Sequence, residues 1–327
     1  MNPKALDRAR DRFRMSHAKS DPFDARVLAA FVRTDHSHLR ALEPSSEPAQ
    51  ELKLLTRDYH RQVRQQTRLL NQLTATLKEY YPRPLEVFED LKTALAREFL
   101  HTFPTPEALA RLTPKQWQRW ARAQRLSEAR AQELWEALKQ PQLSVPAHVV
   151  RAKARLVRAL VAQLATTVAT VKEYQTAVAD FFASVPAAEW ARTLPGGNSG
   201  TTIPSLWAEL GDALGRWQSF QHLQAQAGVV PVTERSGKQQ VVRFRFACNT
   251  HLRYASYTFA WLSLAHSEWA RAYYRQQRAR GHSHPQALRA LGAKWLKIIF
   301  VMWKHRAVYD ENCHLANIAR QRLRQAA

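Results

Sequence analysis

Cysteine, glycine and acidic residues are scarce in this chain of 327 residues, and each shortage excludes a class of protein. The two cysteines, Cys248 and Cys313, provide neither a disulfide framework nor the ligand spacing of a zinc finger, which fits a reducing cytoplasm. Only nine glycines are present, and most segments show helical rather than strictly alternating periodicity. We therefore predict a mainly α-helical protein.

Long apolar runs and targeting signals are further features that we do not find. No apolar run approaches the roughly 18–20 residues of a membrane-spanning helix. Residues 1–14 are charged and lack the apolar core of a secretory signal, and no lipidation motif is present. We therefore expect a cytoplasmic protein without a membrane partner.

The deficit of acidic residues leaves a large positive charge. Lysine and arginine total 49 against 27 aspartates and glutamates, which gives a formal net charge of +22. Such an excess favours polyanions, because cations that neutralise phosphates release counterions. Nucleic acid is the favoured partner. A basic soluble protein without such a partner and a protein of anionic membrane surfaces are the alternatives.

The helical pattern divides the chain into three regions, residues 1–42, 43–185 and 186–327. In the first region, Asp21 is expected to cap a helix whose first position is Pro22. The second region contains two long helices around a smaller helical insert, which form either an antiparallel hairpin of coiled-coil character or an ordinary bundle. Their apolar positions are Leu52, Leu55, Tyr59, Val63, Leu70, Leu73, Leu77 and Tyr80, then Val149, Leu156, Leu160, Leu164, Val168, Val171 and Val178.

The third region begins with a glycine-rich turn that contains Gly196, Gly197 and Gly200. Glycines allow a close approach to phosphate, and the N-terminus of a following helix offers free N–H groups. This arrangement is typical of helix-hairpin-helix modules that hold the DNA backbone. A plain connection between two helices is the alternative.

A basic segment with short β character follows at residues 229–253. Ser236 lies in a Ser-Gly turn, and a serine that attacks phosphate needs exposure, a mobile loop and cations around the transferred group. A hairpin tip that contacts phosphates without chemistry is the alternative. The candidate nucleic-acid ligands of this segment are Arg235, Lys238, Arg243, Arg245 and Arg253.

Two carboxylates near the front, Asp21 and Asp24, are a candidate metal site. Residues three apart in a helix share a face, so the pair can hold or help to hold Mg²⁺. The alternative is that the two acids only stabilise the start of the helix.

The C-terminal helices are rich in aromatic and basic residues. Trp295, Ile298, Ile299 and Met302 are predicted to form one buried face, and the arginine and lysine rows are candidates for nucleic-acid contact. The histidines of this segment, His282, His284, His305 and His314, have no recognised metal-ligand spacing.

Several of these segments, taken in order, resemble the insertion-sequence 110 transposases, also called the 116/110/902 type. The resemblance covers essentially the whole chain. Its members carry blocks similar to the ones seen here at residues 20–25 (SDPFDA), 194–196 (LPG), 208–212 (AELGD), 227–231 (AGVVP), 236–238 (SGK) and 249–253 (NTHLR). Cys248 and residues 197–199 (GNS) depart from the family pattern.

The resemblance implies an RNase-H-like nuclease domain with a D-E-D-D metal tetrad, followed by a domain with a catalytic serine. It implies that Asp21 and Asp24 are the last two tetrad acids, which bind Mg²⁺, and that Ser236 is the nucleophile. The first two tetrad acids would then precede Met1, so residues 1–42 are expected to be the remnant of a truncated nuclease domain with impaired strand transfer.

The same resemblance implies the partners of the chain. They are duplex DNA, a structured bridge RNA that guides recombination, and further copies in a homodimer or homotetramer near the bacterial nucleoid. The alternative function is a non-catalytic helical remnant that binds nucleic acid.

Overall fold

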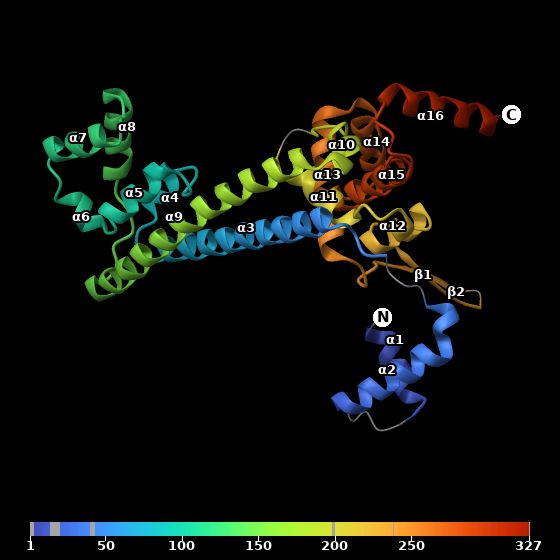
Figure 1. Cartoon of the computed structure of the whole chain (residues 1–327). Helices are drawn as coiled ribbons and strands as arrows, with labels where there is room; N and C mark the ends of the chain where they lie inside the picture. Colours follow the sequence, from blue (N-terminus) through green and yellow to red (C-terminus); the bar gives the residue numbers. More distant parts are fainter. Residues whose placement is uncertain (1–2, 14–19, 40–42, 198–199, 238, 327) are drawn as a thin grey trace. The chain divides into compact units, whose positions relative to one another are not determined.

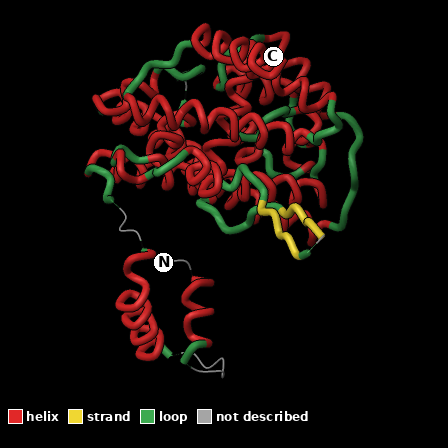
Figure 2. The backbone as a smooth tube through the Cα atoms, turned by 90° about the vertical axis from the view of Figure 1, so that its right-hand side faces the viewer, coloured by secondary structure: helices red, strands yellow, loops and turns green. Residues whose placement is uncertain are grey.

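A computed structural model describes residues 3–13, 20–39, 43–197, 200–237 and 239–326 of the chain. Helices dominate these residues, and their only sheet is a two-stranded hairpin, so the predicted mainly α fold is confirmed (Figures 1 and 2). The chain separates into two compact units, Met1–Ser45 and Ser46–Ala327.

The first unit is a pair of helices and a short turn. Arg10 joins the two helices, because its guanidinium donates to both carboxylate oxygens of Asp24 at 3.1 and 3.2 Å. Ser20 occupies the N-cap position, so the prediction that Asp21 caps the second helix is wrong by one residue. The elements are α1 (Pro3–Asp11), α2 (Asp21–Asp35) and the 3-10 turn η1 (His36–His38).

The second unit is organised around two long antiparallel helices, α3 (Glu47–Tyr80) and α9 (Ala147–Ser184), which pack along one another (Figure 1). The predicted helical hairpin is thus observed. On α9 the buried stripe runs through Val150 and Val157, one residue after the predicted positions Val149 and Leu156. The apolar stripes of α3 and α9 bury one another within one chain, so they do not by themselves require a second copy.

A small helical insert closes one end of this hairpin. Trp117 donates its indole N–H to the carbonyl of Ala131 at 2.8 Å, and the Tyr80 hydroxyl donates to Pro104 at 2.6 Å. These bonds satisfy polar atoms inside an aromatic core that includes the end of α3. The insert consists of α4 (Arg83–Val87), α5 (Ala94–Thr102), α6 (Pro106–Ala110), α7 (Pro114–Ala123) and α8 (Glu128–Lys139).

The C-terminal helices surround the other end of the hairpin. Trp207, Trp295 and Trp303 are almost fully buried there, and Ile299 and Met302 share the predicted buried face with Ile298 at its edge. The elements are η2 (Pro186–Ala188), α10 (Glu189–Arg192), α11 (Thr202–Leu210), η3 (Leu214–Arg216), α12 (Phe220–Ala227), β1 (Val232–Ser236), β2 (Gln239–Arg243), α13 (Thr250–His266), α14 (Glu268–Ala279), α15 (His284–His305) and α16 (Glu311–Ala326).

Helix α9 is more apolar than the sequence pattern indicated. Among the described residues, α9 contains an 18-residue stretch of mean hydropathy 1.3, which suffices to cross a membrane by length and composition alone. Only 28% of that stretch is buried within the chain. The statement that no run approaches spanning length is therefore wrong, although a single such helix is weak evidence because core helices of soluble proteins meet the same criteria.

Candidate functional site

The hairpin formed by β1 and β2 carries the candidate nucleophile at its tip. Ser236 ends β1 and pairs with Gln239, the first residue of β2, so the two strands are joined by a two-residue turn. Gly237 has φ +56°. Two-residue hairpin turns need a positive φ at a central position, and glycine adopts it without steric cost. Ser236 is exposed, as are both faces of nearly the whole hairpin. The serine hydroxyl is therefore open to a large ligand.

Cations follow the hairpin, although the chain itself engages some of them. Arg235 is exposed and contacts Gln240 through Nε at 3.0 Å, and Arg243 pairs with Glu234 at 2.9 Å. The hydrogen bond to Gln240 and the ion pair with Glu234 are both exposed to solvent and contribute little energy, so a phosphate can replace them. Lys238 lies outside the described residues. Arg235 thus remains a candidate phosphate ligand next to Ser236. Arg243 pairs with Val232 at the other end of the hairpin and remains a candidate ligand for a phosphate farther along the strand.

Two other predicted ligands serve the chain itself. Arg245 is half-buried and donates to the carbonyl of Val230 at 3.3 Å. Arg253 donates to the carbonyl of Arg245 and lies over the ring of Phe244, with its guanidinium carbon 4.7 Å from the ring centre. The structure therefore gives Arg245 and Arg253 an internal role at the foot of the hairpin, and DNA contact by either remains a prediction.

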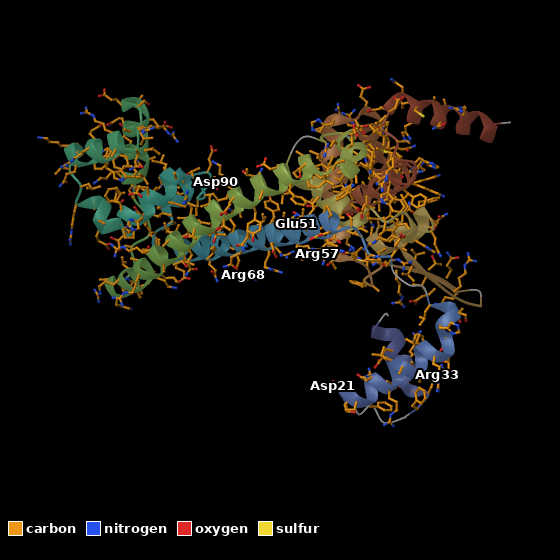
Figure 3. All side chains as sticks on the ribbon, viewed as in Figure 1. Asp21, Arg33, Glu51, Arg57, Arg68 and Asp90 are labelled. Atoms are coloured by element: carbon orange, nitrogen blue, oxygen red, sulfur yellow. The ribbon has the colours of Figure 1, made fainter. Side chains whose placement is uncertain are left out.

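A buried acid, which the sequence analysis named only as part of a motif, joins three helices. Glu209 on α11 is 2% exposed. Arg57, which Figure 3 labels on α3, donates to its two carboxylate oxygens at 2.6 and 3.0 Å, and Asn249 at the start of α13 donates to it at 2.7 Å. Lys53 adds a longer ion pair at 3.9 Å. This network fixes the base of the long hairpin against the C-terminal helices.

The neighbours of Glu209 in sequence strengthen the same junction. Asp212 accepts hydrogen bonds from the backbone N–H and the hydroxyl of Ser46, just before α3. The indole of Trp303 donates to the carbonyl of Gly211 at 2.7 Å. The motif at residues 208–212 thus connects α3, α13 and α15 through hydrogen bonds, so its observed role here is structural.

The charges around Glu209 shift its own pKa and the pKa of the neighbouring His60. Burial alone raises the pKa of Glu209, but hydrogen bonds from Arg57 and Asn249, with the charges of Arg57 and Lys53, outweigh it and hold the pKa below its usual value. Burial, then the positive charges of His251 and Arg64, lowers the pKa of His60 to about 4. His60 is therefore neutral at physiological pH. The cations on this face of α3 outnumber the one buried acid.

The glycine turn before α11 is packed against its own chain. A side-chain carbon at Gly196 would lie 2.9 Å from the Leu262 side chain, and one at Gly197 would overlap the carbonyl oxygen of Arg192. Residues 198 and 199 lie outside the described part. The two glycines thus serve internal packing, and a phosphate contact remains a prediction chiefly for Gly200, where a Cβ would meet nothing within 4 Å.

We expect Gly197→Ala to destabilise the protein by about 2–3 kcal/mol, because the added methyl group overlaps backbone that cannot yield cheaply. Gly200→Ala is the matched control. Its surroundings are open, so the expected loss is only the roughly 1–2 kcal/mol of a positive φ. Urea unfolding followed by tryptophan fluorescence measures both. Equal losses would show that the contact at Arg192 is unimportant.

The candidate metal ligands lie on the first turn of α2. Asp21 is exposed and Asp24 is half-buried, with its charge balanced by Arg10. No group of three or more histidine, cysteine or acidic side chains able to hold a metal is found among the described residues. The pair alone can supply part of a ligand set, since Mg²⁺ often binds one or two carboxylates and keeps several waters.

Comparison with known proteins gives a consistent picture across the chain. Residues 1–82 match a family model for DEDD transposases of the IS110 type, and residues 188–275 match the model described as "Transposase IS116/IS110/IS902 family". The mini-circle putative transposase for IS117 of Streptomyces coelicolor is 33% identical over 322 residues, which is 95% of this chain and 77% of that protein.

Two further relatives are a putative transposase and an uncharacterized protein of an insertion element. The putative transposase y4uE of Sinorhizobium fredii is 38% identical over 112 residues, 34% of this chain and 31% of that protein. An uncharacterized 43.6 kDa protein of insertion element IS110 from Streptomyces coelicolor is 25% identical over 303 residues, 90% of this chain and 72% of that protein. Because one relative matches 95% of the chain at 33% identity and two segments match the family models, this chain belongs to the IS116/IS110/IS902 family of transposases.

Proposed function

We propose that this transposase cuts and joins DNA through a covalent bond between Ser236 and a DNA phosphate. The observation that carries the proposal is the exposed Ser236 hydroxyl at the tip of the hairpin, with the exposed Arg235 next to it in sequence. A nucleophile needs access to its phosphate, and guanidinium groups stabilise the charge that develops on the transferred group.

The proposed chemistry is two successive transesterifications. The Ser236 oxygen bonds to phosphorus, its proton leaves to a base, and the bond from phosphorus to a sugar oxygen breaks. The released sugar hydroxyl takes up a proton. A sugar hydroxyl of the partner strand then attacks the same phosphorus, and the serine hydroxyl is restored. One phosphate ester replaces another in each step, so no external energy source is needed.

The divalent metal that we propose at Asp21 and Asp24 would supply Lewis-acid polarisation of a phosphate when bound. Both side chains supply carboxylate oxygens, the ligands that Mg²⁺ prefers, and they lie three residues apart on one helix. Arg10 competes with a cation for Asp24. Asp21 would therefore hold the metal directly. Asp24 would become a second ligand once the Arg10 guanidinium no longer occupies its carboxylate oxygens.

Removing both carboxylates tests this site by binding alone. We expect Asp21→Asn with Asp24→Asn to weaken Mn²⁺ binding at least about tenfold in a titration followed by electron paramagnetic resonance, because both ionised ligands are lost. Arg10→Gln should strengthen Mn²⁺ binding, since it frees Asp24. Unchanged Mn²⁺ affinity in the double variant would place the metal elsewhere.

We propose a structured guide RNA as the second nucleic-acid partner. The support is the net charge of +22 together with exposed arginines at two places, on the β-hairpin and on α3 at Arg61, Arg64 and Arg68. Both places suit phosphate backbones, which bind by counterion release. Sequencing of RNA that copurifies with the chain from a host carrying the whole element tests this partner, and a structured element-encoded RNA is the expected result.

The test of the proposed function is recombination between an element end and a target DNA, with Ser236 present or replaced by alanine. We expect joined product only when the serine is present, and equal DNA binding in both cases. A chain that binds DNA and RNA but forms no joined product or adduct would instead favour the alternative function, a non-catalytic helical nucleic-acid-binding protein.

A further inference from the structure

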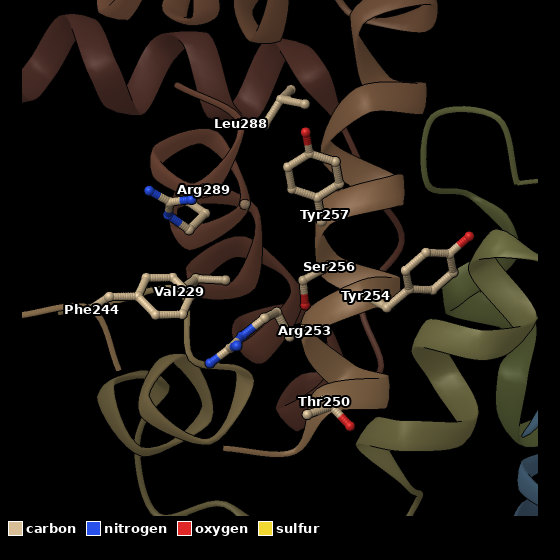
Figure 4. A pocket seen from close by; sticks show the side chains of 10 residues that line it. Val229, Phe244, Thr250, Arg253, Tyr254, Ser256, Tyr257, Leu288 and Arg289 are labelled. Atoms are coloured by element: carbon tan, nitrogen blue, oxygen red, sulfur yellow. The ribbon is translucent and has the colours of Figure 1, made fainter. Parts of the chain in front are cut away.

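A cavity of about 310 Å³ lies at the foot of the hairpin whose tip carries Ser236. The two ends of the hairpin opposite its tip both line the cavity, because Val229 precedes β1 and Phe244 follows β2. Helices α13 and α15 complete the walls (Figure 4). The residues that give the cavity its chemical character are Phe244, Arg253, Tyr254, Tyr257, Arg289 and Gly292.

The walls combine flat aromatic rings with flat cations. The guanidinium carbons of Arg253 and Arg289 lie 4.7 and 5.2 Å from the centre of the Phe244 ring, and Figure 4 draws them on two sides of that ring. Phe244 is 40% exposed and Tyr254 is 51% exposed, so both rings are open to a ligand. Rings and guanidinium planes of this kind stack on the faces of planar ligands.

One polar group in the wall lacks a partner. The Nε atom of Arg253 is buried and has no hydrogen-bond acceptor among the described residues. That atom is inaccessible to solvent, so it does not contact a ligand. The cavity wall is mainly apolar and aromatic, and the guanidinium groups of Arg253 and Arg289 are its cationic parts.

These properties select for a nucleobase. A base is planar, stacks on aromatic and guanidinium groups, and carries oxygen and nitrogen acceptors on its edges. The volume lies at the small end of the range for ligand pockets, which suits a single ring system. The sugar-phosphate chain attached to a base is an anion, and it would meet a chain of net charge +22.

We propose that this cavity receives one nucleobase drawn out of its stack, from a strand that lies along the hairpin. This inference rests on the proposed function, because it places the base on the strand that reaches Ser236. Phe244 lies five residues after Gln239, the partner of Ser236, which is about 17 Å of extended strand. That length corresponds to about five nucleotides of stacked DNA between the base and the reacting phosphate.

Duplexes with one unpaired base test the proposal with the whole chain. Extraction of a base is easiest where it is already unpaired, so a protein with such a pocket binds a bulged duplex more tightly than a matched one. We expect a DNA duplex with a single adenine bulge to bind about five- to twentyfold more tightly than the matched duplex. An RNA duplex with the same bulge forms a second arm, which distinguishes the DNA strand from the guide RNA as the source of the base.

Variants assign this preference to the cavity. Phe244→Ala should abolish the preference for the bulge and leave binding to matched DNA within about twofold, because only the stacking surface is lost. Arg289→Ala should reduce the preference severalfold and provides a second variant in case Phe244→Ala misfolds. Trp261→Ala is the matched control, since Trp261 is 63% exposed and does not line the cavity.

Photocrosslinking provides an independent reading. A 5-iodouracil placed at the bulge should crosslink to a peptide that contains Phe244, Tyr254 or Tyr257. Equal binding of bulged and matched duplexes by the unaltered chain, or a bulge preference that survives Phe244→Ala, would overturn the proposal while leaving the role of Ser236 intact. Failure to bind even matched DNA would instead contradict the proposed function.

Discussion

Replacing Ser236 with alanine is expected to reduce DNA strand joining by at least about 10³-fold, because a covalent intermediate cannot form without its nucleophile. The affinity for DNA should stay within about twofold of the unaltered chain. The hydroxyl is exposed at the hairpin tip, so its removal leaves no cavity and no buried polar group without a partner. Gel-based assays of joined product and of DNA binding measure the two quantities.

Thr233→Ala is the matched control for this variant. Thr233 also has an exposed hydroxyl on β1, at the end of the strand away from the tip. We expect its removal to leave strand joining within about threefold, as for most surface substitutions away from a site. If Ser236→Ala retains full joining activity, the hairpin is a binding element and the reaction proceeds at another residue.

The second large effect is on stability. Glu209→Ala is expected to destabilise the second unit by about 2–4 kcal/mol, because its removal leaves the half-buried charge of Arg57 and the amide of Asn249 without their acceptor. The lower end reflects the partial exposure of Arg57, whose side chain is 34% accessible. Unfolding by urea, followed by the fluorescence of the buried tryptophans, measures the loss.

The pH dependence of stability distinguishes the charge of Glu209 from its shape. The pKa of Glu209 is depressed in the folded state, so its contribution is present above the unfolded pKa of about 4.3 and is lost as pH falls through the lower folded value. Glu209→Gln should therefore flatten the acid limb of the stability curve. Glu234→Gln is the control, because the ion pair between Glu234 and Arg243 is exposed and contributes little. An equal flattening of the acid limb in Glu234→Gln would contradict the role assigned to the Glu209 charge.

Local patterns were sufficient to predict the long elements of the fold. The three-to-four spacing of apolar residues predicted both long helices, and the Ser-Gly turn in a segment of short β character indicated the hairpin. The residues that form the buried stripe of α9 could not all be predicted from the sequence. Val149 and Val150 are adjacent and chemically equal, so only packing against α3 decides which of them is buried.

The Glu209 network could not be predicted, because its members are far apart in the chain. Arg57 lies 152 residues and Asn249 lies 40 residues from Glu209, and no local pattern relates them. The available signal was the motif itself, since an acid within an otherwise apolar helix segment (LWAEL) must find a partner when it is buried.

The roles of basic motif residues were also beyond the sequence. Arg253 and Arg235 look alike in a basic segment, yet one is half-buried over Phe244 and the other is exposed on β1. Spacing in the sequence does not report whether a guanidinium meets a carbonyl of its own chain or remains open to a phosphate. For Gly196 and Gly197, likewise, only the fold shows that the close approach is to Leu262 and Arg192.

The most direct test of the central claim is to identify the atom that carries the DNA after the reaction is trapped. The chain would be incubated with a nicked DNA substrate whose cleaved end cannot rejoin, then digested and examined by mass spectrometry. We predict a nucleotide joined by a phosphodiester to the peptide that contains Ser236. A nucleotide found on a tyrosine or another serine, or efficient joining with no protein–DNA bond at any stage, would contradict the claim.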